Sequence, residues 1–291
     1  MHQQTTQYTR LLVMKTTNSL DLENFARGLL ILLFVFIYRP SFANEVKNEL
    51  IKGKIENKTI NVDGIERNYK VYSPIQIDNQ LSPLIFLLHG NGGSASQLIG
   101  INGTVAPFKR WLKIAEQNRL ILALPEGTKG INNKQGWNDC REDAITNPGT
   151  DDTQFISTLI KTISLNYPVD HNRVFISGIS NGGHMALRIA LEIPEQINAV
   201  AAIAASIPKN SECLPARLPI SVLFMNGTLD PIMPYYGGSI LSKNSERGSV
   251  LATEHSVYYW IKNNKIKTPG KIDFLNLDSK NQSRKNLAIN N

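Results

Sequence analysis

A serine between two glycines is the residue in this chain best suited to chemistry. Gly178, Ser180 and Gly182 form the pattern G-x-S-x-G, with an apolar segment at 173–177 before it and a helical pattern at 181–193 after it. A strand, a tight turn and a helix in this order are typical of a nucleophile elbow, which holds a serine in a strained, exposed position. Glycines flank it because the turn has no room for a β-carbon. The alternative is a glycine-rich turn whose serine has no chemical role.

A second glycine-rich loop follows the apolar segment 83–88 and reads HGNGG. A loop in this place, together with the residue after the nucleophile, supplies backbone N–H groups to a developing oxyanion. We therefore expect an oxyanion hole formed by the N–H groups of Asn181 and Asn91, with Gly92 as a second choice for the latter. An ordinary flexible turn is the alternative.

An aspartate is placed where it could orient a catalytic base. Asp230 follows the apolar segment 220–225 and comes after Ser180 in chain order. This is the order and position of the acid in a Ser-Asp-His arrangement, where the carboxylate orients the histidine and stabilises its charged form. The alternative is an aspartate that only caps its own turn.

The apolar segments predict the sheet that positions these residues. Most of them are apolar throughout rather than alternating, which favours strands buried on both faces, as in a parallel sheet. Helical patterns alternate with them, so we expect an α/β fold with right-handed crossovers. The strands are expected at 69–72 (at an edge), 83–88, 120–124, 173–177, 199–204 and 220–225, and the helices at 152–167, 181–193 and 249–263.

Several longer segments carry a family resemblance. They read LIFLLHGNGG, WNDC, DDTQFI, YPVDHNRVFISGISNGGHMALRIA and PISVLFMNGTLDPIMPYYGG, and together they cover residues 68–238. With these segments the chain resembles the secreted esterases that include polyhydroxybutyrate depolymerases and feruloyl esterases. The resemblance implies an α/β-hydrolase fold, with a mostly parallel sheet and helices on both faces, and ester hydrolysis through Ser180 and Asp230.

The resemblance also implies a histidine base on a loop after one further strand. Residues 256–291 contain no histidine. We therefore expect the C-terminal strand and histidine loop to be missing, through truncation or a frameshift, and the activity to be low or absent. None of the five histidines has the expected place: His2 lies in the leader, His89 in the oxyanion loop, His171 at the other end of the sheet, His184 in the elbow helix, and His255, the least unsuitable, in a predicted helix.

The amino terminus has the pattern of an export signal. Residues 28–38 are an apolar run, shorter than the about 20 residues that span a bilayer as a helix. Arg27 precedes it, and Ser41 and Ala43 supply the small residues of a cleavage site. We predict a signal peptide over residues 1–43, secretion after cleavage at Ala43, and no stable membrane anchor. An uncleaved anchor is the alternative.

The remaining chain is expected to form one esterase domain over residues 44–278 and a polar tail over 279–291. An oxidising compartment would permit a disulfide between Cys140 and Cys213, and two unpaired cysteines are the alternative. Two cysteines cannot form a four-cysteine zinc site, and we expect no metal or organic cofactor. The net charge of +7 comes from scattered basic residues, so nucleic acid is not an expected partner.

The leading hypothesis is a secreted serine esterase that acts on a polyester or on aromatic or acetyl esters of plant polysaccharide. Trp137, Tyr235 and Tyr236 either line the acyl or aromatic site or only pack. Two other functions stay open. One is an impaired remnant or binding protein that lacks the base, and the other is a serine peptidase on the same fold.

Overall fold

The described part of the chain comprises residues 9–14, 52–77, 80–101, 103, 106–242 and 245–267 of a computed structural model. The apolar run at 28–38 and the tail at 279–291, on which the signal and tail predictions depend, lie outside the described residues. Within those residues, no helix combines the length and the apolar character needed to cross a bilayer.

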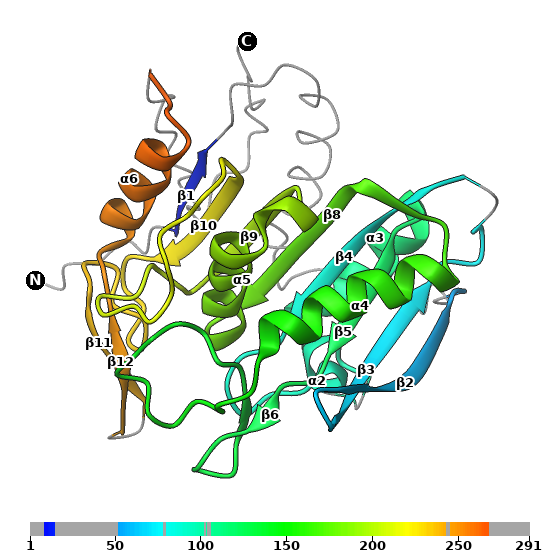
Figure 1. Ribbon diagram of the computed structural model, residues 1–291, viewed down its shortest axis with the longest axis horizontal. Coiled ribbons are helices and arrows are strands. Elements are labelled where there is room, and N and C mark those ends of the chain that lie inside the picture. The colour runs from blue at the N-terminus through cyan, green and yellow to red at the C-terminus, as the bar shows by residue number, and fades with distance from the viewer. Residues whose placement is uncertain are drawn as a thin grey trace, which may run out of the picture.

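An eight-stranded sheet forms the centre of the molecule (Figure 1). Its strands are β1 (Thr9–Met14), β2 (Lys54–Val62), β3 (Ile65–Ser73), β4 (Ser82–Leu88), β5 (Ile121–Pro125), β8 (Val169–Ile179), β9 (Ala199–Ile203) and β10 (Ser221–Gly227). They lie in the order β1-β10-β9-β8-β4-β5-β3-β2. The central strands β10, β9, β8, β4 and β5 pair in parallel. The prediction of a mostly parallel sheet is confirmed.

Helices cover both faces of this sheet (Figure 1). On one face, α4 (Asp152–Asn166), α5 (Asn181–Glu192) and α6 (Thr253–Asn263) share an apolar core with the strands. On the other face, α2 (Ala95–Leu98) and α3 (Arg110–Asn118) form a second core. All residues of β5 and β9 are buried, which explains why these strands are apolar throughout.

The two edges of the sheet differ from the sequence interpretation. Residues 69–72 lie in β3, which is not an edge strand, because β2 pairs antiparallel along its whole length. At the other edge β1 pairs antiparallel with β10. Thr9–Met14 falls within residues 1–43, for which the sequence predicts a cleaved signal peptide outside the fold. The short apolar segment TRLLVM covers an otherwise open strand edge, which natural sheets rarely leave exposed.

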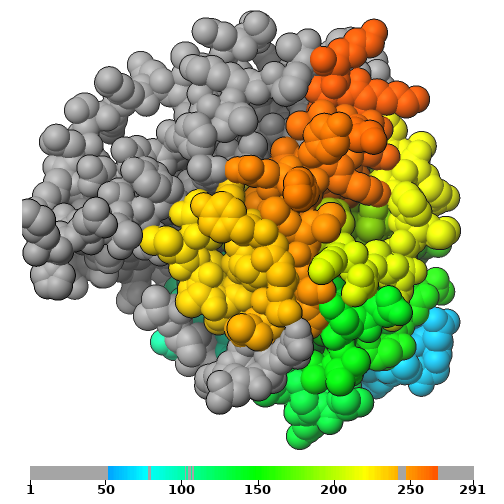
Figure 2. Space-filling view, turned by 90° about the vertical axis from the view of Figure 1, so that its left-hand side faces the viewer, coloured from blue at the N-terminus to red at the C-terminus, as the bar shows by residue number. Residues whose placement is uncertain are grey.

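Two small hairpins extend beyond the central sheet. One joins β6 (Thr128–Lys129) to β7 (Gln135–Gly136), and the other joins β11 (Gly238–Ser242) to β12 (Ser245–Val250). The sequence predicted neither. The sequence predicts a helix from residue 249, but α6 begins at Thr253. Ser249 and Val250 instead belong to β12 and pair with β11. Figure 2 shows the β11–β12 hairpin and α6 together on one face of the molecule.

Candidate functional site

The predicted site residues gather at one edge of the sheet. Leu88 of β4 lies opposite Gly178 of β8, Gly178 opposite Ala202 of β9, and Ala202 opposite Phe224 of β10. The loops that follow these strands therefore leave the sheet at the same end, where α/β sheets bind their ligands. These loops carry Asn91, Ser180 and Asp230.

Ser180 forms a strained turn between β8 and α5. Its backbone angles are φ 56° and ψ −122°, a region that a non-glycine residue occupies only when the surroundings hold it there. Two backbone hydrogen bonds do this: Ser180 N donates to Ile203 O at 2.8 Å, and His184 N donates to Ser180 O at 3.0 Å. The side chain stays partly exposed. This backbone geometry is the one expected of a nucleophile elbow, and the role of Ser180 as nucleophile stays a prediction.

The flanking glycines are required by close backbone contacts. A Cβ on Gly178 would lie 2.0 Å from Gly182 O, and a Cβ on Gly182 would lie 2.5 Å from the carbonyl oxygens of both Leu88 and His89. Both distances are too short for any side chain. The missing β-carbons therefore let the elbow close and let the loop after β4 approach it.

The loop after β4 passes close to Ser180. A Cβ on Gly90 would lie 3.4 Å from Ser180 Cβ. The Gly92 N–H donates to Gln135 O at 2.6 Å and is therefore occupied. Within the described part of the chain, neither the Asn91 N–H nor the Asn181 N–H has a hydrogen-bond acceptor. The geometry thus favours Asn91 over Gly92 as the partner of Asn181 in an oxyanion hole.

The side chain of Asn181 is held by the segment before α4. Its Oδ1 accepts from Trp137 N at 2.7 Å, while its Nδ2 donates to Trp137 O at 2.9 Å and to Asp139 Oδ2 at 2.6 Å. Asp139 in turn accepts from Arg141 Nε at 2.9 Å and from Arg141 Nη2 at 2.6 Å. These contacts fix the first residue of α5 and with it the direction of its backbone N–H.

Asp139 stays ionised although it is fully buried. Burial alone would raise the pKa of its carboxyl. The charge and hydrogen bonds of Arg141, helped by the amide of Asn181, outweigh that effect and hold the pKa below its usual value. The Asp139–Arg141 ion pair thus holds the side chain of Asn181 in place next to Ser180.

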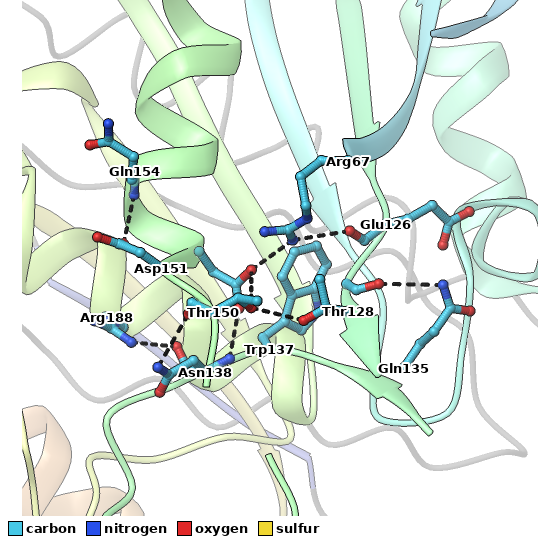
Figure 3. Close-up of polar contacts among 12 residues, drawn as sticks. Arg67, Glu126, Thr128, Gln135, Trp137, Asn138, Thr150, Asp151, Gln154 and Arg188 are labelled. Atoms are coloured by element: carbon cyan, nitrogen blue, oxygen red, sulfur yellow. Dashed lines mark hydrogen bonds and ion pairs between the residues drawn. The ribbon is translucent and has the colours of Figure 1, made fainter. Parts of the chain in front are cut away.

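A further set of polar contacts braces the same segment (Figure 3). Arg67 of β3 donates to Asp152 Oδ1 at 2.7 Å and to Glu126 O at 3.2 Å. Asp152 Oδ2 accepts from Asn138 N at 2.8 Å, and Asn138 O accepts from Arg188 Nη1 of α5 at 2.8 Å. Burial raises the pKa of Asp152 in spite of Arg67. The segment that holds Asn181 is therefore tied to β3, α4 and α5.

The two buried histidines are structural. His89 Nδ1 donates to Gly90 O at 2.8 Å and its Nε2 accepts from Gly127 N at 3.0 Å. His184 Nδ1 donates to Ser180 O at 2.9 Å. Burial lowers the pKa of His89 to about 4 and that of His184 to about 3, so both rings are neutral.

His171, at the start of β8, and His255, on α6, are exposed. No hydrogen bond joins Ser180 Oγ to any histidine in the described ranges.

Asp230 lies in the turn after β10, as expected. Its Oδ1 accepts backbone hydrogen bonds from Ile232 N at 2.8 Å and Met233 N at 2.9 Å. These bonds make it a turn cap and also fix its carboxylate at the sheet edge. The role of triad acid stays a prediction.

The structure joins Cys140 and Cys213 in a disulfide across 73 positions of sequence. Glu192 lies near both sulfurs, and the three residues are the one cluster of potential metal ligands found in the described ranges. Disulfide sulfurs are not thiolates and do not serve as metal ligands in this form. The bond instead ties the segment around Asp139 to the loop after β9.

The three aromatic residues that the sequence suggests could line the site differ in how far they are exposed. Trp137 is fully buried, and its Nε1 donates to His89 O at 2.8 Å, so it packs beneath the oxyanion loop. Tyr235 is also buried. Tyr236, in edge contact with it, is 76% exposed.

The sequence reasoning missed Asp139, Arg141 and Arg247. Arg247 of β12 hydrogen-bonds through Nη1 to Asn91 Oδ1, and its backbone oxygen accepts from Arg141 Nη1 at 2.6 Å. The WNDC segment contains Asp139 and could have drawn attention to it. No pattern in the sequence singles out Arg247, because its partner Asn91 is 156 positions away.

Several known esterases are similar to this chain in sequence. A putative esterase, NocK, from Nocardia uniformis subsp. tsuyamanensis is 32% identical over 156 residues, which cover 53% of this chain and 42% of NocK. Feruloyl esterase D from Neurospora crassa is 28% identical and the match covers 60% of this chain and 57% of that protein. A bifunctional acetylxylan esterase/xylanase from Neocallimastix patriciarum is 27% identical, with 61% and 24% covered.

The chain thus spans from about a quarter to somewhat over half of the length of these relatives. The family model for phospholipases and carboxylesterases matches residues 70–248, which include Asn91, Ser180 and Asp230. On this match, which covers more than half of its length, the chain belongs to the phospholipase/carboxylesterase family.

Proposed function

We propose that this protein is a serine carboxylesterase. The observation that carries the proposal is the strained Ser180, with φ 56° and ψ −122°, at the start of α5 and against the loop after β4. Ser180 is the nucleophile, the N–H groups of Asn91 and Asn181 form the oxyanion hole, and Asp230 orients the base. A helix N-terminus beneath the reacting atoms adds favourable electrostatics.

The reaction follows from these positions. A base takes the proton from Ser180 Oγ as Oγ bonds to the ester carbonyl carbon, and the carbonyl oxygen becomes an oxyanion held by the two N–H groups. Collapse of this intermediate breaks the bond to the alcohol, which leaves with the proton from the base. Water then attacks the acyl-enzyme in the same way, which releases the carboxylic acid and restores Ser180.

The substrate proposal draws on the names of the relatives. A feruloyl esterase and an acetylxylan esterase among them favour aromatic or acetyl esters of plant polysaccharide. A polyester such as polyhydroxybutyrate is supported only by the resemblance of the sequence. Secretion is supported by the pattern of residues 1–43 and by the disulfide, which is typical of oxidising compartments.

Hydrolysis of p-nitrophenyl butyrate by the full chain tests the proposal, with the Ser180→Ala variant beside it. Imidazole is added to one set of assays as an external base, so that the result does not depend on which group serves as base. We expect turnover that imidazole increases and that Ser180→Ala removes. Equal rates for the two proteins at every imidazole concentration would refute the proposal. A p-nitroanilide of the same acyl group serves as control, and efficient cleavage of it would indicate a peptidase instead.

A further inference from the structure

Two cationic side chains lie against the Asn91–Gly92 turn beside the nucleophile. Arg247 bonds through Nη1 to Asn91 Oδ1. On the neighbouring residue, a Cβ on Gly92 would lie 3.7 Å from Lys134 Cδ, so the stem of this exposed lysine packs against the turn. The two cations come from separate hairpins, β11–β12 and the turn between β6 and β7.

Neither cation is neutralised within the described part of the chain, where no carboxylate forms an ion pair with Arg247 or Lys134. The acidic side chains nearby make contacts with other groups. Asp139 is paired with Arg141, and Glu126 Oε1 accepts a hydrogen bond from Ala95 N at 3.1 Å. Asp143 accepts a hydrogen bond from Ser249 Oγ through Oδ2, while its buried Oδ1 has no hydrogen-bond partner in the described ranges, and Asp230 caps its own turn. The turn therefore carries two cationic side chains with which no carboxylate in the described ranges forms an ion pair.

The guanidinium of Arg247 also has donors without acceptors. A guanidinium has five N–H donors, of which Nη1 here bonds to a neutral amide oxygen. Nε is buried and has no hydrogen-bond partner in the described ranges. An orphaned buried donor is uncommon in native proteins and calls for an explanation. A carboxylate accepting from a guanidinium is the arrangement that best satisfies such a group.

We propose that Arg247, with Lys134 on the other side of the turn, forms an anion subsite beside Ser180 that selects esters carrying a free carboxylate. The proposal rests on the proposed esterase function. Gly90 lies near Ser180, since a Cβ built on Gly90 would lie 3.4 Å from Ser180 Cβ, and the next residue, Asn91, is the one that Arg247 binds. A carboxylate a few bonds from the scissile ester would therefore reach the guanidinium while the ester carbonyl occupies the oxyanion hole.

Matched pairs of neutral and anionic esters test this subsite. The carboxylate is placed on the acyl part in mono-p-nitrophenyl glutarate, with p-nitrophenyl butyrate as its neutral partner. It is placed on the leaving group in 4-carboxyphenyl butyrate, with phenyl butyrate as its partner. Imidazole is present throughout. We expect Arg247→Gln to lower kcat/KM for one anionic ester about tenfold or more beyond any loss for its neutral partner, because the bond from Arg247 to Asn91 affects both esters alike. The pair that responds identifies the side of the ester on which the carboxylate lies.

Arg217→Gln is the control, because it also removes one arginine charge, but at a position far from Ser180. Arg217 bonds to Glu192 O at the far end of the 12-residue helix α5, about 18 Å from Ser180. It is expected to leave both members of each pair unchanged. Equal losses for neutral and anionic esters in Arg247→Gln would show that Arg247 acts only by holding Asn91, and no loss for either would also overturn the subsite.

A binding measurement separates failure of the subsite from failure of the esterase proposal. Calorimetric titration of the full chain with monomethyl glutarate should show binding that Arg247→Gln weakens about tenfold, whereas dimethyl glutarate should show no such dependence. Intact binding without Ser180-dependent turnover would reject the esterase and keep the subsite. Equal affinity for the wild type and Arg247→Gln would reject the subsite, whatever the turnover.

Discussion

At the residue scale, the site depends on the two glycines beside Ser180, because they have no β-carbon. Ser180 takes its strained conformation because Gly178 and Gly182 let backbone oxygens approach to distances that no β-carbon permits. These residues could be predicted from the sequence because the G-x-S-x-G pattern encodes a local turn. Asp139 could not, since its role arises from contact with a residue 42 positions away.

Gly182→Ala tests this packing. Its new Cβ would lie 2.5 Å from two backbone oxygens, so we expect a loss of about 3 kcal/mol or more in the free energy of unfolding. Gly149→Ala is the matched control, because its Cβ would meet nothing within 4 Å. It should change stability by less than about 1 kcal/mol. Urea denaturation of both variants measures this, and similar stabilities for the two would contradict the geometry.

His184 links stability to pH. Burial lowers its pKa from 6.5 to about 3, so between these values the unfolded chain binds a proton that the folded chain does not. The free energy of unfolding should therefore fall as the pH falls below about 6.5, by up to about 1.4 kcal/mol per pH unit from this group. Above pH 6.5 the ring is neutral in both states and has no effect.

His184→Leu should lessen this dependence between pH 6.5 and 5 and leave the part due to His89, whose pKa burial lowers to about 4, whereas His255→Leu, at an exposed position, should leave it unchanged. Urea denaturation at several pH values measures both. An equally steep loss in His184→Leu would show that other groups cause the acid sensitivity.

At the element scale, the segment between β7 and α4 does most to fix the site. It has almost no regular structure, yet it holds Asn181 through Trp137 and Asp139 and is tied to the loop after β9 by the disulfide. The sequence predicted the central strands and α4 and α5 well, because their apolar patterns reflect burial. It missed the β11–β12 hairpin, since its short strands pair only with each other and carry no long apolar pattern.

Removing the disulfide measures its contribution. In the chain-entropy model, opening a cross-link between positions 73 apart costs about 4 kcal/mol. We expect the Cys140→Ser and Cys213→Ser double variant to lose about this much in the free energy of unfolding, and the wild type to lose the same amount after reduction. An unchanged stability in both cases would mean that the two cysteines are not bonded in solution.

At the scale of the whole molecule, the two edge strands of the sheet differ in how far along the chain they lie from the strands with which they pair. The edge formed by β2 belongs to a hairpin that is local in sequence, whereas the edge at β10 is covered by Thr9–Met14 from the region assigned to the leader. The features of a signal peptide carry no information about whether Thr9–Met14 pairs with β10, a strand more than 200 positions away. The sequence could therefore not reveal this contact.

Deleting residues 1–43 tests whether β1 belongs to the fold. Without it, the outer edge of β10 loses its hydrogen-bond partner, and we expect faster amide exchange in residues 221–227 and more aggregation than in the full chain. Hydrogen exchange followed by mass spectrometry compares the two proteins. Identical exchange in β10 would show that Thr9–Met14 does not cover this edge in solution.

The proposed function requires Ser180 to act as a nucleophile beside an oxyanion hole. Mass spectrometry of the full chain after mixing with p-nitrophenyl butyrate and imidazole tests it most directly, because it identifies the acylated residue. We expect one butyryl group on the peptide that contains Ser180, and none on that peptide in Ser180→Ala. Acylation only at lysines, or no acylation of the folded wild type, would contradict it.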